Sequence, residues 1–342
     1  MDFTSVRKET VCLNPQEDMA ERRIPSEIRF DPLTGRTARI CHFMPLQWEK
    51  PDLEALVNGT ESWCPFCPDR VLKVTPCFPE ELIPEGRMQQ GDMVIFPNLA
   101  PYDCIAAIGT FGARHFIPMT GFTPDLMASV FGFALDFFRQ VKRSGHPEAV
   151  YPVLNWNYMP LAGSSLIHPH VQLISSSSAP NLMRQELEAS KDYLERHGST
   201  FWEDLTAAEA ASGERYLGKI GRTHFMTSFA PIGVAGDVLA VVEDARCTLD
   251  LDPRDLLDLA NGLANVIGVY DTMGLYNFNL AFFTGTPADD HFRFHLLFSP
   301  RTSFSPQLGT PDTNAMRNLF NETLCMAFPE EINERLRKGF DT

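Results

Sequence analysis

The order of strand-like and helix-like segments repeats once along this chain of 342 residues, and the repeat limits the folds open to it. The first copy consists of two strand-like runs, a helix and two further runs, at 93–96, 104–108, 124–142, 150–156 and 171–175. The second copy has the same order, at 223–230, 237–243, 253–270, 277–283 and 292–298. Thr123-Pro124-Asp125 is a helix start, because proline suits the first helical position and an acid suits the first turn. The repeat predicts a duplicated α+β unit, while one α+β domain without duplication is the simpler alternative.

Three segments lie outside the repeat. Residues 24–45 predict a strand pair around a turn, since Pro32 and Gly35 stand at turn positions. Residues 46–63 are expected to form a loop, and residues 181–196 a charged helix. We therefore expect an N-terminal half at 1–180 and a C-terminal half at 181–342.

Charge and cysteine content exclude some classes of protein. The formal net charge of −15 disfavours nucleic acid and anionic membrane surfaces as partners, although local N–H donors can still bind an anionic small substrate. No apolar run reaches transmembrane length, and residues 1–21 carry mixed charges and no apolar segment typical of a signal peptide. We expect a cytoplasmic protein whose eight cysteines are mostly free thiols, so that a close pair is a metal candidate.

The motif His168-Pro169-His170-Val171-Gln172 carries the strongest chemical signal. Side chains alternate along a strand, so a strand here would direct His168, His170 and Gln172 to one face. Neutral imidazole is a nucleophile near pH 7 and a good leaving group from phosphorus, and an amide can donate to a phosphoryl oxygen. Taken alone, two histidines at this spacing are more often a chance feature of a half-buried strand.

The pair Cys64-Pro65-Phe66-Cys67 is the second signal. Two thiolates at this spacing can chelate one Zn²⁺, and His115 and His168 are the candidates for the other two ligands. A thioredoxin-like redox site is the alternative, but it requires a strand before the motif and a helix after it. A loop is expected before this motif and several prolines follow it, which favours the metal.

Together these motifs resemble the galactose-1-phosphate uridylyltransferase family, a branch of the histidine-triad superfamily. The family's HPHxQ motif stands at 168–172, its zinc pattern at Cys64, Cys67, His115 and His168, and its early DPLTG segment at 31–35. Further matches are Asn157, the turn Gly163-Ser164-Ser165, and the segment Phe96-Pro97-Asn98. The resemblance extends from about residue 26 to 300. It implies a duplicated histidine-triad-like fold with a mainly antiparallel sheet and flanking helices.

The resemblance also implies roles for individual residues. His168 would bind one structural zinc with Cys64, Cys67 and His115, and His170 would be the nucleophile. Gln172 and Ser165 would assist catalysis. The expected nucleotide contacts are Arg29, Asn98, Asn157, Gly163 and Ser164. A homodimer is the family-level expectation.

The C-terminal half departs from the family pattern. Some members hold a second metal with a glutamate and three histidines, and these positions fall here on Glu186, Asn279, His295 and Leu297. Only two of the four can ligate, so we expect no second metal. His291 is too far along the strand from His295 to replace the missing ligand. Arg301 is a candidate phosphate contact, with a solvated arginine as the alternative.

The resulting hypothesis is a nucleotidyltransferase that moves a nucleoside monophosphate through His170. The donor would be a nucleotide sugar or a similar diphosphate, and the acceptor a sugar phosphate or phosphate. One alternative is a nucleotide phosphorylase or hydrolase of the histidine-triad type. The other is a nucleotide-binding protein whose catalysis has lapsed.

Overall fold

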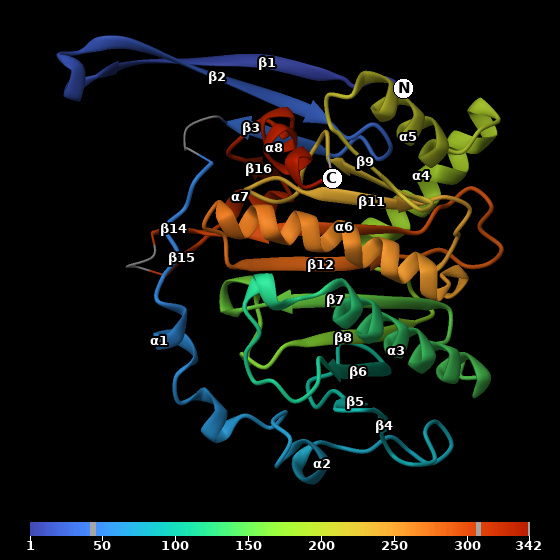
Figure 1. Cartoon of the computed structure of the whole chain (residues 1–342). Coiled ribbons are helices and arrows are strands. Elements are labelled where there is room, and N and C mark those ends of the chain that lie inside the picture. The colour runs from blue at the N-terminus through green and yellow to red at the C-terminus, as the bar shows by residue number, and fades with distance from the viewer. Residues whose placement is uncertain (42–45, 306–308, 341–342) are drawn as a thin grey trace.

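The computed structural model describes residues 1–41, 46–305 and 309–340, and a ten-stranded sheet forms its centre (Figure 1). The strands lie in the order β4-β5-β6-β8-β7-β12-β13-β11-β10-β9, and each neighbouring pair is antiparallel. Their bounds are β4 Met88–Gln90, β5 Met93–Pro97, β6 Ile105–Thr110, β7 Tyr151–Tyr158, β8 His170–Ser176, β9 Tyr216–Ile220, β10 Thr223–Thr227, β11 Val238–Val242, β12 Asn277–Phe283 and β13 His295–Arg301.

The strand order is a palindrome of two units. The first unit runs β5-β6-β8-β7 across the sheet, and the second runs β12-β13-β11-β10, which is the same order reversed. A long helix follows the second strand of each unit in sequence, α3 at Pro124–Arg143 and α6 at Pro253–Thr272. The duplicated α+β unit predicted from the sequence is therefore confirmed. The two units join where β7 pairs with β12.

Helices α3 and α6 pack on the same face of the sheet and against each other (Figure 1). Their starts follow the sequence signals, because Thr123 caps α3 and Asp252 forms a capping box with Asp255 at α6. Large apolar side chains of both helices and of the strands below them form the main core, including Phe131, Phe138, Leu263 and Ile267. This core fixes the strands that carry the histidine motif.

The opposite face of the second unit is covered by α4 (Asn181–His197) and α5 (Phe201–Ser212). Residues of these two helices and of the strands beneath them form a second apolar cluster, which includes Met183, Leu187, Phe201, Trp202, Met226 and Phe292. On the same face of the first unit, the short helix α2 (Val71–Val74) and the chain before it take this place. The two units therefore share a fold but not the segments that cover them.

A second, smaller sheet has the order β1-β2-β3-β16. Its strands are β1 Ser5–Asn14, β2 Ala20–Phe30, β3 Thr37–Cys41 and β16 Thr323–Cys325. The predicted strand pair at 24–45 corresponds to β2 and β3, while its end at 42–45 lies outside the described residues. Strand β1 was not predicted, and with β2 it forms a long hairpin that extends away from the main sheet (Figure 1).

The remaining elements are short. They are α1 Leu53–Val57, β14 Ser303–Ser305, β15 Thr310–Pro311, α7 Ala315–Phe320 and α8 Pro329–Leu336. The expected loop at 46–63 contains α1 and a 3-10 turn at Thr60–Trp63, because Asp52 accepts hydrogen bonds from the first N–H groups of α1. Among the described helices, none combines the length and the hydropathy needed to cross a bilayer.

Candidate active site and metal centre

His170 opens strand β8 with one ring nitrogen engaged and the other available. Its Nδ1 lies 2.8 Å from the main-chain oxygen of His168, and a carbonyl can only accept, so Nδ1 carries the proton. The lone pair is then on Nε2, which has no hydrogen bond to any described residue. Burial lowers the pKa of His170, so the ring is neutral at pH 7. A buried neutral imidazole with a free Nε2 suits nucleophilic attack.

His168 lies in the turn before the strand, which corrects the expectation of a strand running through both histidines. Its Nε2 donates to the main-chain oxygen of Gly112 at 2.8 Å, and its Nδ1 faces Cys67 Sγ at 3.8 Å. The two histidines of the motif therefore present opposite ring nitrogens, and only His170 and Gln172 share the strand face.

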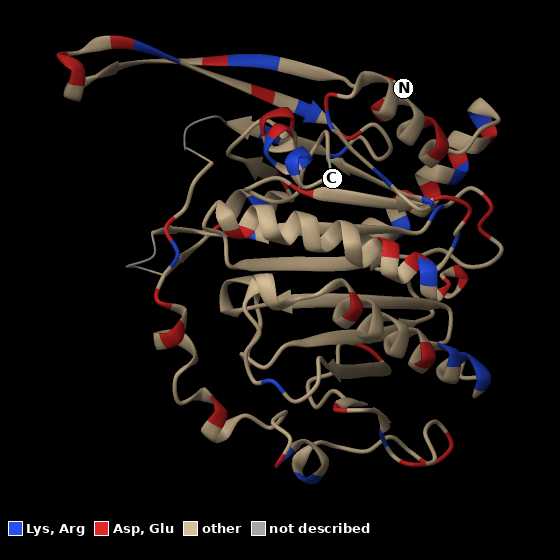
Figure 2. Ribbon diagram, in the orientation of Figure 1, with Lys and Arg blue, Asp and Glu red and all other residues tan. Residues whose placement is uncertain are grey.

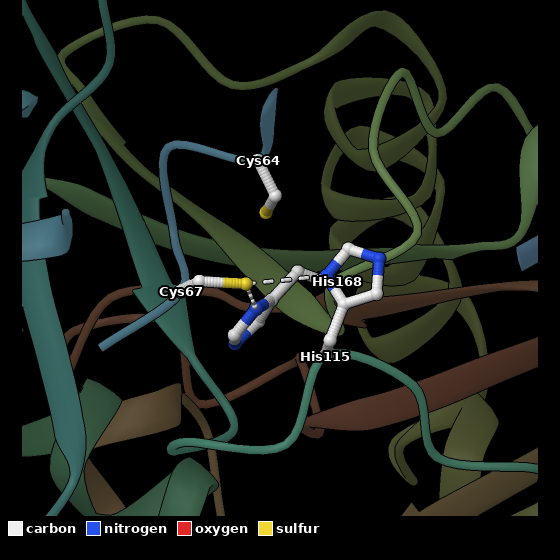
Figure 3. A group of neighbouring side chains, drawn as sticks. All are labelled: Cys64, Cys67, His115 and His168. Carbon is white, nitrogen blue, oxygen red and sulfur yellow. Dashed lines mark hydrogen bonds between the residues drawn. The ribbon is translucent and has the colours of Figure 1, made fainter. Parts of the chain in front are cut away.

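Cys64, Cys67, His115 and His168 converge on one point (Figure 3), and one potential ligand atom from each lies within 4.8 Å of the others. Cys64 ends the 3-10 turn, and Cys67 precedes α2. His115 follows β6, and its Nδ1 lies 3.4 Å from Cys67 Sγ. The sequence prediction brought these four residues together correctly, although they come from three separate segments.

Hydrogen bonds on the outer side of the cluster set the ring orientation of its histidines. The Thr60 hydroxyl donates to the Val57 carbonyl, so it accepts from His115 Nε2 at 2.7 Å. His168 Nε2 likewise donates to Gly112. Both Nδ1 atoms are then unprotonated and directed at the thiols, as metal binding requires. Burial raises the pKa of the Cys67 thiol to about 11 and lowers the pKa of His168 to about 4, so burial favours the neutral form of both groups. A bound metal cation would instead favour the thiolate form of Cys67. The four groups can therefore hold one metal ion.

Phe66 lies between this cluster and His170, and the sequence did not predict this contact. Its ring lies edge-on to His170 at 5.2 Å and to His168 at 6.2 Å between centroids. Phe66 is one of the two residues between the cysteines, so a metal held by them would also hold this ring. The position of Phe66 inside the CxxC motif indicates that it lies near the metal cluster. Its contact with His170 could not be predicted, because it depends on the fold.

Two amides lie side by side next to His170 on β7 and β8. Gln172 pairs with Asn155 across the two strands, and the buried side-chain oxygens of both lack a hydrogen-bond partner among the described residues. Gln172 was predicted, whereas Asn155 was not. Strands β7, β8 and β12 contain no Asp, Glu, Lys or Arg (Figure 2). An anion bound over these strands would therefore meet neutral donors rather than countercharges.

The turn before the motif has an unusual backbone. Met159 has φ 69° and Gly163 has φ 90°, on either side of the 3-10 turn Pro160–Ala162. The Ser164 hydroxyl donates to the Leu166 carbonyl at 2.6 Å, so it stabilises this loop. Ser165 is exposed, and its hydroxyl is available to a ligand.

Two predicted nucleotide contacts lie elsewhere. Asn98 follows β5, and its side-chain oxygen accepts from the Ala100 N–H at 3.0 Å. Arg29 lies in β2 of the smaller sheet, where its guanidinium bonds Glu27 and Glu330. These bonds tie β2 to α8 and do not connect Arg29 with His170. As contacts to a nucleotide, both residues stay predictions.

Comparison with known proteins identifies the fold. Two structures from Arabidopsis thaliana, a GalT-like protein and an ADP-glucose phosphorylase with bound ADP-glucose, each match with a TM-score of 0.69 at 16% identity. They cover 92% of this chain, which covers 98% and 99% of them. The chain has the GalT-like fold. A uridylyltransferase structure matches with a TM-score of 0.65 at 17% identity, over 92% of this chain and 98% of that one.

Sequence comparison adds a relative of this chain. An uncharacterized protein of Archaeoglobus fulgidus is 29% identical over 315 residues, which are 91% of this chain and 92% of the relative. No protein-family model matches.

In the C-terminal half of the GalT-like fold, Glu186 and His295 meet. His295 Nε2 lies 3.3 Å from a Glu186 carboxylate oxygen, and its Nδ1 lies 3.1 Å from the Arg293 main-chain oxygen. The ring is stacked between Trp202 at 4.2 Å and Phe283 at 4.7 Å. Phe283 is the residue opposite His295 on β12. Asn279, the other position of β12 considered for a second metal, pairs with Ser299, four residues along the strand from Phe283.

Asn279 and Arg301 instead belong to one polar network. Asn279 donates to Asn157, and Arg301 donates to the side-chain oxygen of Asn279 at 2.7 Å. Arg301 also bonds Asp312, which is buried. Arg301 is therefore neither solvated nor free to bind a phosphate with its whole guanidinium, which corrects both sequence expectations for it. The expected absence of a second metal stays a prediction.

Proposed function

We propose that this chain is a nucleotidyltransferase that uses His170 as a covalent carrier of a nucleoside monophosphate. The observation that carries the proposal is the state of His170, whose Nδ1 is fixed by a carbonyl while its neutral Nε2 is free. The HPHxQ motif and the GalT-like fold support the same chemistry.

The reaction has two balanced steps. His170 Nε2 attacks the α-phosphorus of a nucleoside diphosphate sugar, the N–P bond forms, and the bond to the bridging oxygen breaks and releases a sugar 1-phosphate. A phosphate or sugar phosphate oxygen then attacks the same phosphorus and frees the histidine. Gln172, Ser165 and Asn157 would donate hydrogen bonds to the phosphoryl oxygens as charge moves onto them.

We also propose that Cys64, Cys67, His115 and His168 hold one structural zinc ion. Two sulfur and two nitrogen ligands suit Zn²⁺, and four protein ligands leave no position for water. The ion would hold the segment before α2 against the start of β8. Cys64 and Cys67, on either side of Phe66, would then keep the Phe66 ring against the His170 ring.

A phosphorylase is the second candidate, because one of the two best-matching structures reported above is an ADP-glucose phosphorylase. This activity would use the same first step and inorganic phosphate as the acceptor. Transfer to water, or nucleotide binding without turnover, are the other outcomes open to the experiment. A homodimer remains the expected oligomeric state.

A labelling screen tests the proposal. The protein is incubated with UDP-glucose and ADP-glucose, and intact-mass spectrometry measures the addition of a nucleoside monophosphate. The labelled protein is then given phosphate, galactose 1-phosphate or buffer alone, and the product identifies the acceptor. Labelling that persists in His170→Ala would show that His170 is not the carrier, and nucleotide binding without any label would favour the binding protein.

A further inference from the structure

Two asparagines of β12, in the C-terminal half, hold the turn that precedes the histidine motif. Asn277 accepts a hydrogen bond from the Leu161 N–H at 3.2 Å, and Asn279 Nδ2 donates to the Ala162 carbonyl at 2.8 Å. The turn leads directly into Gly163-Ser164-Ser165. The second half of the chain therefore positions the loop of the first.

This turn needs external support. Met159 combines φ 69° with ψ 162°, which is a sparsely populated conformation for a residue with a side chain. Such a residue keeps its conformation only where the surrounding structure holds it. Asn277 and Asn279 supply such support, because they bond Leu161 and Ala162 shortly after Met159.

Asn279 also determines how Asn157 is oriented. Its Nδ2 donates to the Asn157 side-chain oxygen at 2.7 Å. Because that oxygen is occupied, the NH₂ group of Asn157 is directed away from Asn279. Asn155 pairs with Gln172, and Asn157 and His170 each lie two residues beyond that pair on β7 and β8, so their side chains are on the same face of the sheet.

Arg301 and Asp312 fix the orientation of Asn279 in turn. Arg301 donates to the Asn279 side-chain oxygen at 2.7 Å, which leaves only Nδ2 to face Asn157 and Ala162. Asp312 accepts from Arg301 Nε at 2.9 Å and from the Thr302 N–H at 3.1 Å, and its side chain is almost fully buried. Arg301 thus donates to both Asp312 and Asn279, and Asn279 donates in turn to Asn157.

We propose that Asn279 is a positioning residue for nucleotidyl transfer, which acts by presenting the NH₂ group of Asn157 to a phosphoryl oxygen beside His170. This inference rests on the proposed function. If Asn279 were absent, the Asn157 amide could turn and present its oxygen, which repels an anionic phosphoryl group.

A double-mutant cycle on the full-length protein tests this role. We expect Asn157→Ala to slow labelling by UDP-glucose or ADP-glucose by on the order of 10²–10³, by analogy with the loss of one oxyanion-hole donor. Asn279→Ala should slow it by about tenfold to a hundredfold, because it misplaces one donor. Asn279→Asp should be slower still, since two carboxylate oxygens cannot donate to Asn157. If Asn279 acts mainly through Asn157, then Asn279→Ala has a clearly smaller effect in the Asn157→Ala background than in the wild type, and the remainder reports its contact with Ala162.

Controls separate positioning from folding and from the proposed function. Asn318→Ala, at an exposed asparagine of the same half, should label at the wild-type rate. Multiplicative effects of the two substitutions, or a wild-type rate in Asn279→Ala, would overturn the role of Asn279. If the wild-type protein takes no label, the proposed function fails, and hydrogen exchange of residues 159–165 then tests the positioning itself. Faster exchange in Asn279→Ala supports it, and unchanged exchange contradicts it.

Discussion

At the scale of single residues, the two histidines of the motif differ in which ring nitrogen is free. His168 donates through Nε2 to Gly112 and presents Nδ1 to the thiols. His170 donates through Nδ1 to His168 and leaves Nε2 free. The sequence suggested the pair, and the family resemblance assigned the roles. The tautomers could not be predicted, because each depends on a carbonyl that the fold brings within reach.

Replacing His170 should abolish the covalent step. We expect His170→Ala to take up no nucleoside monophosphate, because no other imidazole among residues 1–41, 46–305 and 309–340 lies on this face beside Gln172. His170→Gly should recover some transfer from an imidazole-linked nucleotide, which supplies the missing ring. Intact-mass spectrometry measures the label, which should be lost in acid and stable in base. His197→Ala, at an exposed histidine of α4, is the matched control and should label normally.

Gln172 offers a second test at this scale. Its substitution by alanine removes a donor to the transferring phosphoryl group, and we expect the labelling rate to fall by on the order of 10²–10³. Gln172→Glu keeps the shape but adds a negative charge, so it should be at least as slow. Single-turnover rates at saturating donor provide the measurement, and an unchanged rate in both variants would remove Gln172 from the mechanism.

At the scale of elements, local sequence signals predicted most helices, strands and turns, but they did not predict which distant segments pair. The capped helices α3 and α6, the apolar strands and the turn at 31–36 all follow from short patterns. Strand β1 is nearly all exposed, so it lacks the half-buried alternation that marks a strand. The contacts of Asn155, Phe66 and Asn279 were not predicted, because they depend on strand register and on packing between distant segments.

The segment between Cys64 and α2 should depend on the metal. We expect Cys64→Ser to bind less zinc and to melt at a lower temperature than the wild type, since a structural metal contributes folding energy. Metal analysis and a thermal melt, each with and without a chelator, measure both effects. Cys77→Ser, at an exposed thiol outside the cluster, is the control. A full metal content in Cys64→Ser would contradict the proposed ligand set.

At the scale of the whole molecule, buried charges hold the two ends of the chain together. Glu330 of α8 bonds both Arg29 of β2 and Arg215, and the side chains of the two arginines are 6% and 3% exposed. Burial alone would raise the pKa of Glu330, but the two guanidinium groups hold it below its usual value. The carboxylate therefore stabilises the fold above the pKa it has in the unfolded chain, and this contribution is lost as the pH falls through the folded-state pKa.

Removing this carboxylate should be costly. We expect Glu330→Ala to lower the free energy of unfolding by about 1–3 kcal/mol, because each of the two buried guanidinium groups loses one carboxylate partner. Glu27 still pairs with Arg29, and Glu209 still pairs with Arg215. Urea unfolding at pH 7 measures the change, which should shrink as the pH is lowered toward the folded-state pKa of Glu330. Glu214→Ala removes an exposed partner of Arg215 and should cost less than about 1 kcal/mol. Equal effects of the two substitutions would show that burial does not set the energy here.

The palindromic sheet has a consequence for stoichiometry. His170 and His295 each open the corresponding strand of their unit, and each has Nδ1 next to the main-chain oxygen two residues earlier. At His295, however, Glu186 lies at Nε2, and Trp202 and Phe283 close both ring faces. The two units thus hold a histidine at equivalent positions, and of these two only His170 has an Nε2 without a partner among the described residues. Under the proposed function, only this one can carry a phosphoryl group. A fully loaded subunit should carry a single nucleotide.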